Sequence, residues 1–372
     1  MQDEEKRTWA EIKLGNLENN YKAIKSMLPD SCELIAVCKA NSYGHGAVQI
    51  AKKLQNLGAS YISVSCYKEA LELRQNGVSL PIIILAPSQP ELAPQIAEIN
   101  AVQAVGNLYV AKKLNEEMAG SGNRLKIHIK LDTGMGRTGF MTNRQETVSD
   151  VLSLLKLENL SCEGVFTHFA DSDDIEDRFT EEQHSRFVSA VEAIEKATGV
   201  NLGMRHCANS GGALNFPNTA MDGARVGLML YGYIPGKAKN SLGLLPVMQL
   251  KTRICEIKDL SAGDSISYGR TYTCTKDTKI AVIPVGYADG LPRRVSGKMK
   301  VLINGETAKQ LGTVCMDMCM VDITNIKSAQ CGDIATVFGE DISLDALADA
   351  ADTISYELLC AVSQRVPRVY TE

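Results

Sequence analysis

The sequence predicts an α/β protein made of a (β/α)8 TIM-type barrel followed by a mostly antiparallel β domain. Short apolar runs alternate with turns and helical patterns from residue 34 to 227. This alternation stops after the connection YGYIPGKAKNSLGLLP, and from about Val247 onward β-like runs are separated by short turns. We therefore expect the barrel at residues 12–240 and the β domain at 241–372, with residues 1–11 packing on the β domain.

The barrel prediction depends on the number of strands in the first part of the chain. Strands that alternate with helices imply right-handed parallel βαβ units, and eight of them close a barrel. A span of about 200 residues fits the lower end of the size range for this fold. A doubly wound open sheet is the alternative. The strand candidates are LIAVCK, YISVSC, PIIILA, AVQAVG, KIHIKLD, CEGVFTHF, GMRHCAN and MDGARVG.

Helical patterns lie between these runs, and several of them end at glycine or asparagine, as helix C-termini prefer. Examples are AVQIAKKLQNLG, KEALELRQNG, QETVSDVLSLLKLENL and EEQHSRFVSAVEAIEKATG. The second part of the chain has one clear helical stretch, SLDALADAAD, which opens with a serine cap. Its β-like runs favour an antiparallel domain. These runs are MQLKTRICEI, DSISYGRTYT, KIAVIPVG, KVLINGE and TVCMDMCMVDI.

Polar residues stand where five of the barrel strands end. In a barrel these ends converge on one face, where active sites are built, whereas in an open sheet they would spread along an edge. The alternative interpretation is that each polar residue simply begins a solvated loop. Their number at equivalent positions favours an active face. The residues are Lys39, Asp132, His168, Asn209 and Arg225.

Lys39 ends an apolar strand and is followed by Asn41, Ser42, Tyr43 and two glycines. One interpretation is a surface lysine at the start of a loop. The other is a partly desolvated amine with a lowered pKa that can form a Schiff base. The small and hydrogen-bonding neighbours suit a cofactor with a phosphate or a carbonyl group, but the local pattern leaves both interpretations open.

The segment KLDTGMGRTGF contains a G-x-G-x-x-G pattern directly after a strand. A dinucleotide site also needs an acidic residue about 20 positions further on, at the end of the next strand. The next strand ends instead at His168, well past that spacing. The arginine within the loop suits an anionic ligand better than close approach of the backbone to a pyrophosphate. We therefore reject an NAD site.

The composition excludes several classes of protein. A formal net charge of −5 argues against a nucleic-acid partner, and no apolar run is long enough to span a membrane. The start MQDEEKRTWAEIKL lacks the layout of a signal peptide, although an upstream membrane region remains an alternative. Eleven cysteines, an odd number, favour a reducing cytoplasm. Cys315 and Cys319 lack a second ligand pair, so we expect no metal.

AVCKANSYGHGA resembles the pyridoxal-phosphate lysine motif of bacterial alanine racemases. The likeness extends in order over nearly the whole chain, from TWAEIKLGNLENNY to RVPRVY. It implies a pyridoxal 5'-phosphate-dependent racemase with fold type III, and a homodimer whose subunits share active sites. The other matching segments are KLDTGMGRTGF, THFA, HCANSGG, DGARVGLMLYG, SYGRTY, GYADG and VCMDMCMVD.

The resemblance also implies roles for individual residues. Lys39 would hold the cofactor as a Schiff base and act as one catalytic base, and Tyr268 would act as the second base across the dimer interface. His168 would pack beside the pyridine ring, with Asn209 nearby, and Arg225 would donate to the ring nitrogen. The residues expected to bind the phosphate are Tyr43, Ser210, Gly227, Leu228 and Tyr356.

The remaining implied residues concern the substrate. Arg137 would contact the cofactor hydroxyl and the substrate carboxylate, supported by Lys130, which some family members carry in a carbamylated form. Tyr287 and Met316 would line the substrate entrance and carboxylate site, with Asp317 in support. Packing within the β domain is the alternative interpretation for most tyrosines and methionines of this half.

Two opposed bases are expected because racemisation removes a proton from one face of the substrate carbon and returns one to the other. Lys39 would serve the D side and Tyr268 the L side. A serine or dual serine/alanine racemase is an alternative, as are a decarboxylase and a non-catalytic cofactor carrier. Tyr356 favours alanine, whereas Met318 stands where a glutamine is common in the family.

Overall fold

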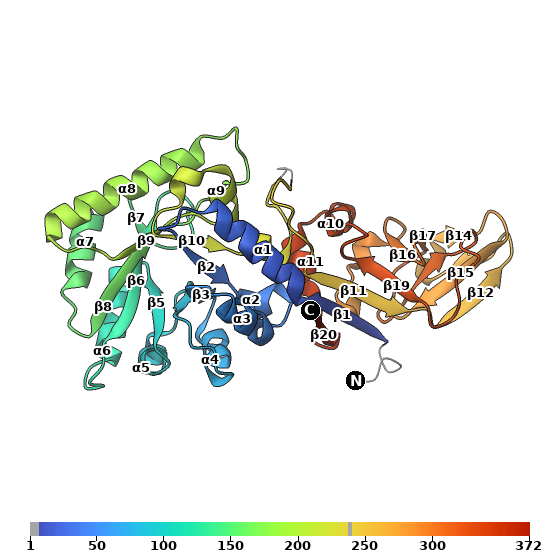
Figure 1. The fold of residues 1–372 in the computed structure, drawn as a ribbon, viewed down its shortest axis with the longest axis horizontal. Coiled ribbons are helices and arrows are strands. Elements are labelled where there is room, and N and C mark those ends of the chain that lie inside the picture. The colour runs from blue at the N-terminus through green and yellow to red at the C-terminus, as the bar shows by residue number, and fades with distance from the viewer. Residues whose placement is uncertain (1–6, 237–239) are drawn as a thin grey trace. The chain divides into compact units, whose positions relative to one another are not determined.

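The computed structural model describes residues 7–236 and 240–372, which divide into two compact units (Figure 1). The barrel unit comprises residues 18–42 and 47–244, and the β unit comprises the described residues up to 17 together with 43–46 and 245–372. Residues 1–6 of the segment expected beside the β domain, and 237–239 of the expected connection, lie outside the described residues.

The barrel unit contains a parallel sheet whose main path has eight strands, as predicted, in the order β10-β2-β3-β4-β5-β6-β8-β9. The two-residue strand β7 (Phe140–Met141) pairs with β6 beside this path. Two backbone hydrogen bonds join the outer strands, from Asp222 N to Arg205 O at 3.0 Å and from Arg225 N to Ala208 O at 2.9 Å, so the sheet closes into a barrel. The strands are β2 (Glu33–Val37), β3 (Tyr61–Val64), β4 (Ile82–Ile84), β5 (Ala101–Val105), β6 (Leu125–Asp132), β8 (Leu160–Phe166), β9 (Met204–His206) and β10 (Gly223–Val226).

Helices follow the strands and lie on the outside of the barrel (Figure 1). Their apolar residues recur at helical spacing, so one side of each is buried; in α3, for example, the buried residues are Ala47, Ile50, Ala51 and Leu54. The helices are α1 (Leu14–Met27), α3 (Ala47–Asn56), α4 (Tyr67–Gln75), α5 (Ala93–Glu98), α6 (Leu108–Glu117), α7 (Glu146–Leu155), α8 (Phe179–Thr198) and α9 (Ser210–Asn215).

Branched side chains from the strands form the core of the barrel unit. Ile35, Ile83 and Val102 from three different strands pack together and are almost fully buried. Burial of a side chain of this size contributes about 1.5–3 kcal/mol. Strands buried on both faces read as continuous apolar runs, which is why these segments were recognisable in the sequence.

The β unit contains a nine-stranded sheet in the order β12-β15-β18-β17-β16-β19-β11-β1-β20. All its described pairings are antiparallel except the one between β1 and β20, in agreement with the predicted fold class. The strands are β1 (Thr8–Lys13), β11 (Met248–Arg253), β12 (Glu256–Leu260), β15 (Thr278–Ile283), β16 (Lys300–Ile303), β17 (Glu306–Leu311), β18 (Cys319–Asp322), β19 (Ile334–Phe338) and β20 (Arg368–Thr371).

Smaller elements complete the β unit. A two-stranded hairpin of β13 (Ser265–Ile266) and β14 (Tyr272–Thr273) carries the SYGRTY segment. Helix α10 (Leu344–Ala351) begins at the expected cap, where the Ser343 hydroxyl accepts from Ala346 N, and α11 (Ser355–Ala361) follows it. Within the described residues, no helix is long and apolar enough to cross a membrane.

Candidate active site

The chain turns sharply at Lys39, immediately after β2. The next four residues, Ala40 to Tyr43, all have φ near 52°, which is the left-handed helical region. None of them is glycine, and this conformation costs roughly 1–2 kcal/mol for each such residue. Local bonds offset part of that cost, including one from Ala40 N to the Glu69 carboxylate at 2.6 Å. The sequence carried no sign of this turn.

Asp132, at the end of β6, organises the G-x-G-x-x-G loop. Its carboxylate accepts hydrogen bonds from the backbone N–H groups of Gly134 at 2.9 Å, Gly136 at 3.1 Å and Arg137 at 3.2 Å. These amides already bind an anion from the chain itself, so they are not arranged around a second one. The geometry therefore supports rejection of a dinucleotide site, and it leaves the Arg137 side chain exposed.

Lys130 lies on the same strand, with its amine buried in the barrel unit. Its Nζ donates to the Thr138 hydroxyl at 2.6 Å and lies 5.8 Å from the centre of the Phe166 ring. Burial, followed by the positive charge of Arg137, lowers the pKa of Lys130 to about 8. A substantial fraction of this amine is therefore neutral slightly above physiological pH.

Arg225, on β10, is held by acceptors from two neighbouring segments, one after β8 and one at the end of β9. One guanidinium nitrogen donates to the Nδ1 and the carbonyl of His206, each at 2.8 Å. The other donates to the carbonyls of Thr167 at 2.7 Å and Cys207 at 3.1 Å, and contacts His168 Nδ1 at 3.3 Å. Burial lowers the pKa of Arg225 to about 10, so the side chain still carries its charge at neutral pH.

The histidines around Arg225 are neutral. Burial, and then the charge of Arg225, place the pKa values of His168 and His206 well below the ordinary value, and the same causes lower the pKa of His128 to about 4. A neutral imidazole that accepts from arginine at Nδ1 carries its proton on Nε2. His206 Nε2 thus donates to His128 Nδ1, 2.9 Å away. Sequence reasoning missed His206 and His128; their only signal was histidine within apolar strands.

The segments after β9 and β10 bring hydroxyl and amide groups together. Asn209 caps α9, where its side-chain oxygen accepts from Gly212 N at 2.8 Å and from the Ser172 hydroxyl at 2.7 Å. The Ser210 hydroxyl accepts from Gly227 N at 3.0 Å, and Leu228 follows directly. In the β unit, the rings of Tyr43 and Tyr356 lie with their centres 6.0 Å apart.

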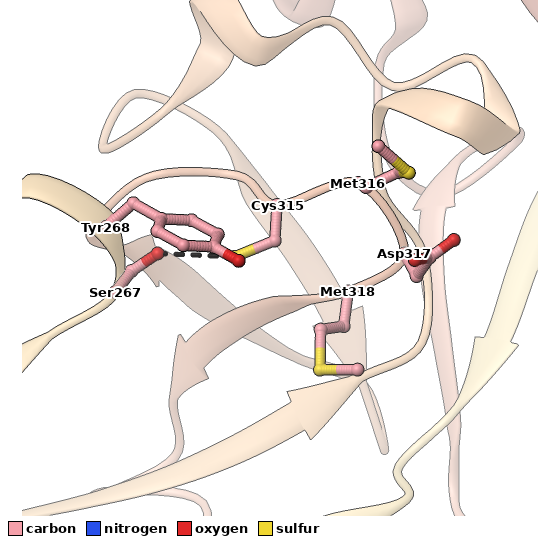
Figure 2. A pocket seen from close by; sticks show the side chains of 6 residues that line it. All are labelled: Ser267, Tyr268, Cys315, Met316, Asp317 and Met318. Atoms are coloured by element: carbon pink, nitrogen blue, oxygen red, sulfur yellow. Dashed lines mark hydrogen bonds between the residues drawn. The ribbon is translucent and has the colours of Figure 1, made fainter.

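Tyr268 lies over a pocket of about 360 Å³ in the β unit (Figure 2). The segment TVCMDM, predicted as part of a strand, forms a loop on the other side of the pocket, because the strand begins only at Cys319. Tyr268, Met316 and Met318 are among the most exposed large apolar residues of the described chain. The pocket is lined by Ser267, Tyr268, Cys315, Met316, Asp317 and Met318.

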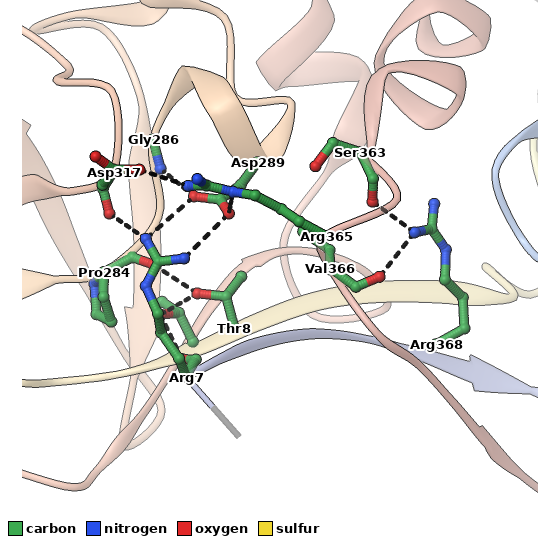
Figure 3. A network of polar contacts seen from close by, with 11 residues as sticks. Arg7, Thr8, Pro284, Gly286, Asp289, Asp317, Ser363, Arg365, Val366 and Arg368 are labelled. Atoms are coloured by element: carbon green, nitrogen blue, oxygen red, sulfur yellow. Dashed lines mark hydrogen bonds and ion pairs between the residues drawn. The ribbon is translucent and has the colours of Figure 1, made fainter. Parts of the chain in front are cut away.

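A network of charges holds the loop that carries Met316 (Figure 3). The Asp289 carboxylate is fully buried and accepts from Arg365 Nε at 2.7 Å, Gly286 N at 2.8 Å and Arg7 at 3.3 Å. Arg365 also donates to the Asp317 carboxylate at 2.8 Å, and these two carboxylates raise the pKa of Arg365 further. Asp289 is a third residue that the sequence did not single out.

The same network joins two loops. Tyr287 N donates to Cys315 O at 3.1 Å, and Ala288 N donates to Met316 O at 3.0 Å. A Cβ atom at Gly286 would lie 2.4 Å from both of these carbonyl oxygens, so only glycine permits this approach. Tyr287, Met316 and Asp317, three residues singled out from the sequence, therefore lie together.

The structure thus brings the expected residues together in two groups, one in each unit. In the barrel unit, hydrogen bonds join Arg225 to His168 and Gly227 to Ser210, and Lys130 and Arg137 flank one loop. In the β unit, Tyr268 and Met316 line one pocket, and Tyr287 N donates to Cys315 O in the loop that carries Met316. The rings of Tyr43 and Tyr356 also lie near each other in this unit. Their functional roles stay predictions.

Models of two protein domains match this chain in succession. The alanine racemase N-terminal domain matches residues 12–235, and the alanine racemase C-terminal domain matches residues 247–370. Among curated relatives, the alanine racemase of Clostridium perfringens strain SM101 is 42% identical over 368 residues, which is 97% of this chain and 95% of that protein. The alanine racemase of Methanococcus maripaludis is 38% identical, covering 97% and 98%.

Solved structures agree with these matches. Alanine racemase from Clostridium difficile 630 superposes with a TM-score of 0.95 at 38% identity, covering 98% of this chain and 96% of that chain. The Bacillus anthracis alanine racemase with bound L-Ala-P has a TM-score of 0.93 at 33% identity, covering 99% and 95%. The matches extend over both the barrel and the β domain, and this chain therefore belongs to the alanine racemase family.

Proposed function

We propose that this protein interconverts L- and D-alanine and uses pyridoxal 5'-phosphate. The observation that carries the proposal is the full-length likeness to alanine racemases, which covers both the barrel with Lys39 and the β domain with Tyr268. A carrier built on a barrel alone has no counterpart to the β domain, which disfavours that alternative.

The donor groups of this chain fit pyridoxal phosphate. The barrel unit offers an amine, a buried guanidinium, and a hydroxyl together with backbone amides. The amine suits a carbonyl, the guanidinium suits a ring nitrogen, and the hydroxyl and amides suit a phosphate. We assign Lys39 to the carbonyl, Arg225 to the ring nitrogen and Ser210, Gly227 and Leu228 to the phosphate, with Tyr43 and Tyr356 as further phosphate donors. When bound, this cofactor supplies an electron sink that acidifies the α-proton of an amino acid.

Arg225 sets how strong that sink is. Its guanidinium stays charged, since its pKa is about 10, and it can donate a hydrogen bond but does not give up its proton near neutral pH. A ring nitrogen that only accepts a hydrogen bond withdraws fewer electrons than a protonated one. We infer that this arrangement limits side reactions such as transamination, at some cost in rate.

Two bases would move the proton on opposite faces of the substrate. Lys39 Nζ serves the D side, and Tyr268 of the partner subunit serves the L side with its phenol oxygen. His168 supports the tyrosine: its Nδ1 accepts from Arg225 at 3.3 Å, so its Nε2–H is left to donate to the phenolate. The high exposure of Tyr268 in a single chain, 71%, supports a homodimer in which a second subunit covers it.

Arg137, Tyr287 and Met316 are proposed to receive the substrate. The Arg137 guanidinium suits a carboxylate, and the Met316 loop offers backbone groups beside an apolar pocket that fits a methyl side chain. The neutral fraction of Lys130 supports addition of its amine to carbon dioxide, which forms a C–N bond and releases a proton. The resulting carboxylate would pair with Arg137.

The experiment that tests the function incubates the purified protein with L-alanine and measures D-alanine and carbon dioxide. We expect D-alanine only. Carbon dioxide would indicate a decarboxylase, and neither product would indicate a carrier. Comparison of kcat/KM for L-alanine and L-serine then separates the two racemase alternatives; we expect alanine to be preferred, because Met316 and Met318 leave the pocket largely apolar.

Lys39→Ala tests the site itself. We expect this variant to lose both the visible absorbance of bound cofactor and racemisation, since no other residue is assigned to the carbonyl. Lys113→Ala is the matched control, because Lys113 is an exposed lysine of the same unit paired only with Glu116 among described residues, at 2.6 Å. Full activity of Lys39→Ala would disprove the assignment.

A further inference from the structure

Ser267, the residue before Tyr268, has a backbone conformation that is normally reserved for glycine. Its φ of 68° and ψ of −176° lie in a region almost closed to residues with a Cβ atom. Gly269 and Arg270 on the other side of the tyrosine also have positive φ, at 73° and 51°. Tyr268 therefore stands at the centre of a strained turn between β13 and β14.

Side-chain bonds to the segment after β17 hold this turn. The Ser267 hydroxyl donates to Thr313 O at 2.5 Å, and in return the Thr313 hydroxyl donates to Tyr268 O at 2.9 Å. The Cys315 thiol lies 3.3 Å from the Ser267 oxygen and 3.6 Å from Thr313 O, and it can donate its one proton to either. The two segments are thus linked around the tyrosine by two directed hydrogen bonds and one thiol contact.

The segment after β17 also packs closely against this turn. Gly312 has φ near 70°, and a Cβ atom there would lie 2.7 Å from Ile266 O and 3.0 Å from the Ser267 Cβ. Beneath the turn, Ile266 packs in an apolar cluster with Cys274, Ile280 and Leu311. The base of the hairpin is therefore packed into the β unit, and Tyr268, together with Ser267, lines the pocket (Figure 2).

We propose that Ser267 is a positioning residue: its strained backbone, clamped by Thr313 and Cys315, aims the Tyr268 phenol at the substrate. Strain of this kind persists only where surrounding contacts over-determine it, and it concentrates at functional sites. The inference rests on the proposed role of Tyr268 as the base for L-alanine. Without the clamp, the turn relaxes and the phenol oxygen leaves the position from which it reaches the α-proton.

Three variants at Ser267 and Thr313 distinguish the effect of the side-chain hydrogen bonds from the effect of the backbone strain. Ser267→Ala removes the hydroxyl but keeps the Cβ atom that disfavours the observed backbone. We expect kcat for L-alanine to fall ~10-fold or more with little change in KM, because proximity rather than binding is lost. Ser267→Gly also lacks the hydroxyl but adopts the backbone freely, so it should retain more activity than Ser267→Ala. Thr313→Val, which frees Tyr268 O, should lower kcat in the same way.

The decisive readout is the isotope effect on each direction of turnover. With α-deuterated L-alanine we expect a larger primary isotope effect in Ser267→Ala than in the native protein, because proton transfer to Tyr268 becomes more rate-limiting. With α-deuterated D-alanine, whose proton goes to Lys39, the effect should change less. Asn304→Ala is the matched control: Asn304 also has positive φ, 50°, in the hairpin between β16 and β17, and its kinetics should match the native protein.

Tyr268→Ala, measured in parallel, separates failure of this inference from failure of the proposed function. If Tyr268→Ala keeps full turnover in both directions, the tyrosine is not a base and the proposed function itself is wrong on this point. If Tyr268→Ala is inactive while Ser267→Ala stays within twofold of the native kcat with unchanged isotope effects, the positioning role is overturned and the catalytic role stands.

Discussion

Lys130 shows how the barrel changes the chemistry of a single side chain. Its amine is removed from water, lies near the positive charges of Arg137 and Arg225, and has one described hydrogen-bond partner, Thr138. A charged amine in this place costs free energy because its hydration is lost, and a neutral one does not. The side chain therefore couples the stability of the fold to pH.

The sign of this coupling follows from the two pKa values. The folded-state pKa of about 8 lies below the ordinary value of 10.5, so the unfolded chain binds more protons between these pH values. The contribution of Lys130 to stability therefore rises with pH across this interval, by roughly 3 kcal/mol in total. Below pH 8 the full penalty is present. In Lys130→Met, which does not titrate, this contribution is absent.

Urea unfolding at pH 7 and pH 9.5, in buffer free of carbon dioxide, measures this effect. We expect the stability of the native protein relative to Lys130→Met to increase between the two pH values. Lys126→Met is the control on the same strand, since Lys126 is an exposed lysine paired with Glu163 at 3.3 Å. A difference that stays constant with pH would show that the amine is not penalised by burial.

Among the elements, the two loops joined by the Asp289 network have the most consequence for the pocket. Neither the Gly286–Gly290 segment nor the Cys315–Met318 segment belongs to a strand of the large sheet. Their relative position depends on two backbone bonds, on the close approach at Gly286, and on the ion pairs of Asp289 and Asp317 with Arg365. We expect these ion pairs to decide where Met316 lies.

Asp289→Asn tests this expectation, because it removes the charge and keeps the shape. The amide nitrogen takes the place of one carboxylate oxygen and so faces a donor in either orientation, Arg365 Nε at Oδ1 or Gly286 N at Oδ2. One donor therefore loses its acceptor, and the variant should be less stable by roughly 2–3 kcal/mol. KM for alanine should rise, since the Met316 loop loses its anchor. Thermal unfolding and steady-state kinetics measure the two effects.

Asp352→Asn is the matched control for Asp289→Asn. Asp352 also pairs with an arginine, Arg294, at 2.7 Å, but both side chains are largely exposed, at 77% and 64%. Exposed ion pairs contribute about 0–1 kcal/mol, so the control should unfold almost like the native protein. Equal losses in the two variants would mean that burial of Asp289 has no special importance.

For the molecule as a whole, the fold followed from patterns that operate over short distances in the sequence. Strands buried on both faces are continuous apolar runs, and apolar residues in the helices between them recur about every 3.6 residues. The barrel was therefore predictable. The β domain was predictable for a similar reason, from short runs separated by turns. One exception is TVCMDMCMVDI, which was predicted as a β-like run but forms a strand only from Cys319 to Asp322.

The candidate site residues were inferred from polar residues at strand ends and from family motifs, and their roles stay predictions. Nothing local indicates that Ala40, Asn41 and Ser42 adopt left-handed conformations, since these residues are not glycine. Asp289 looks like any loop carboxylate, because its partner Arg7 is 282 residues away in the sequence. Such contacts form between segments that meet only in the folded chain, and a linear pattern does not encode them.

The proposed sharing of active sites between subunits gives the sharpest test at the scale of the whole molecule. If each site takes Lys39 from one subunit and Tyr268 from the other, Lys39→Ala and Tyr268→Ala homodimers are both inactive. A mixed dimer, however, contains one site with both native residues and one site with neither. Random reassociation of equal amounts gives mixed dimers for half of the population, so about one quarter of the native activity should return.

The two variants are unfolded and refolded together, or co-expressed with different tags, and L-alanine turnover is then measured. A mixture of Lys39→Ala with Lys39→Ala carrying the other tag is the control and should stay inactive. If Tyr268 instead served the site of its own subunit, every subunit in the mixture would lack one base. No activity would then return, because re-pairing such subunits cannot restore a complete site.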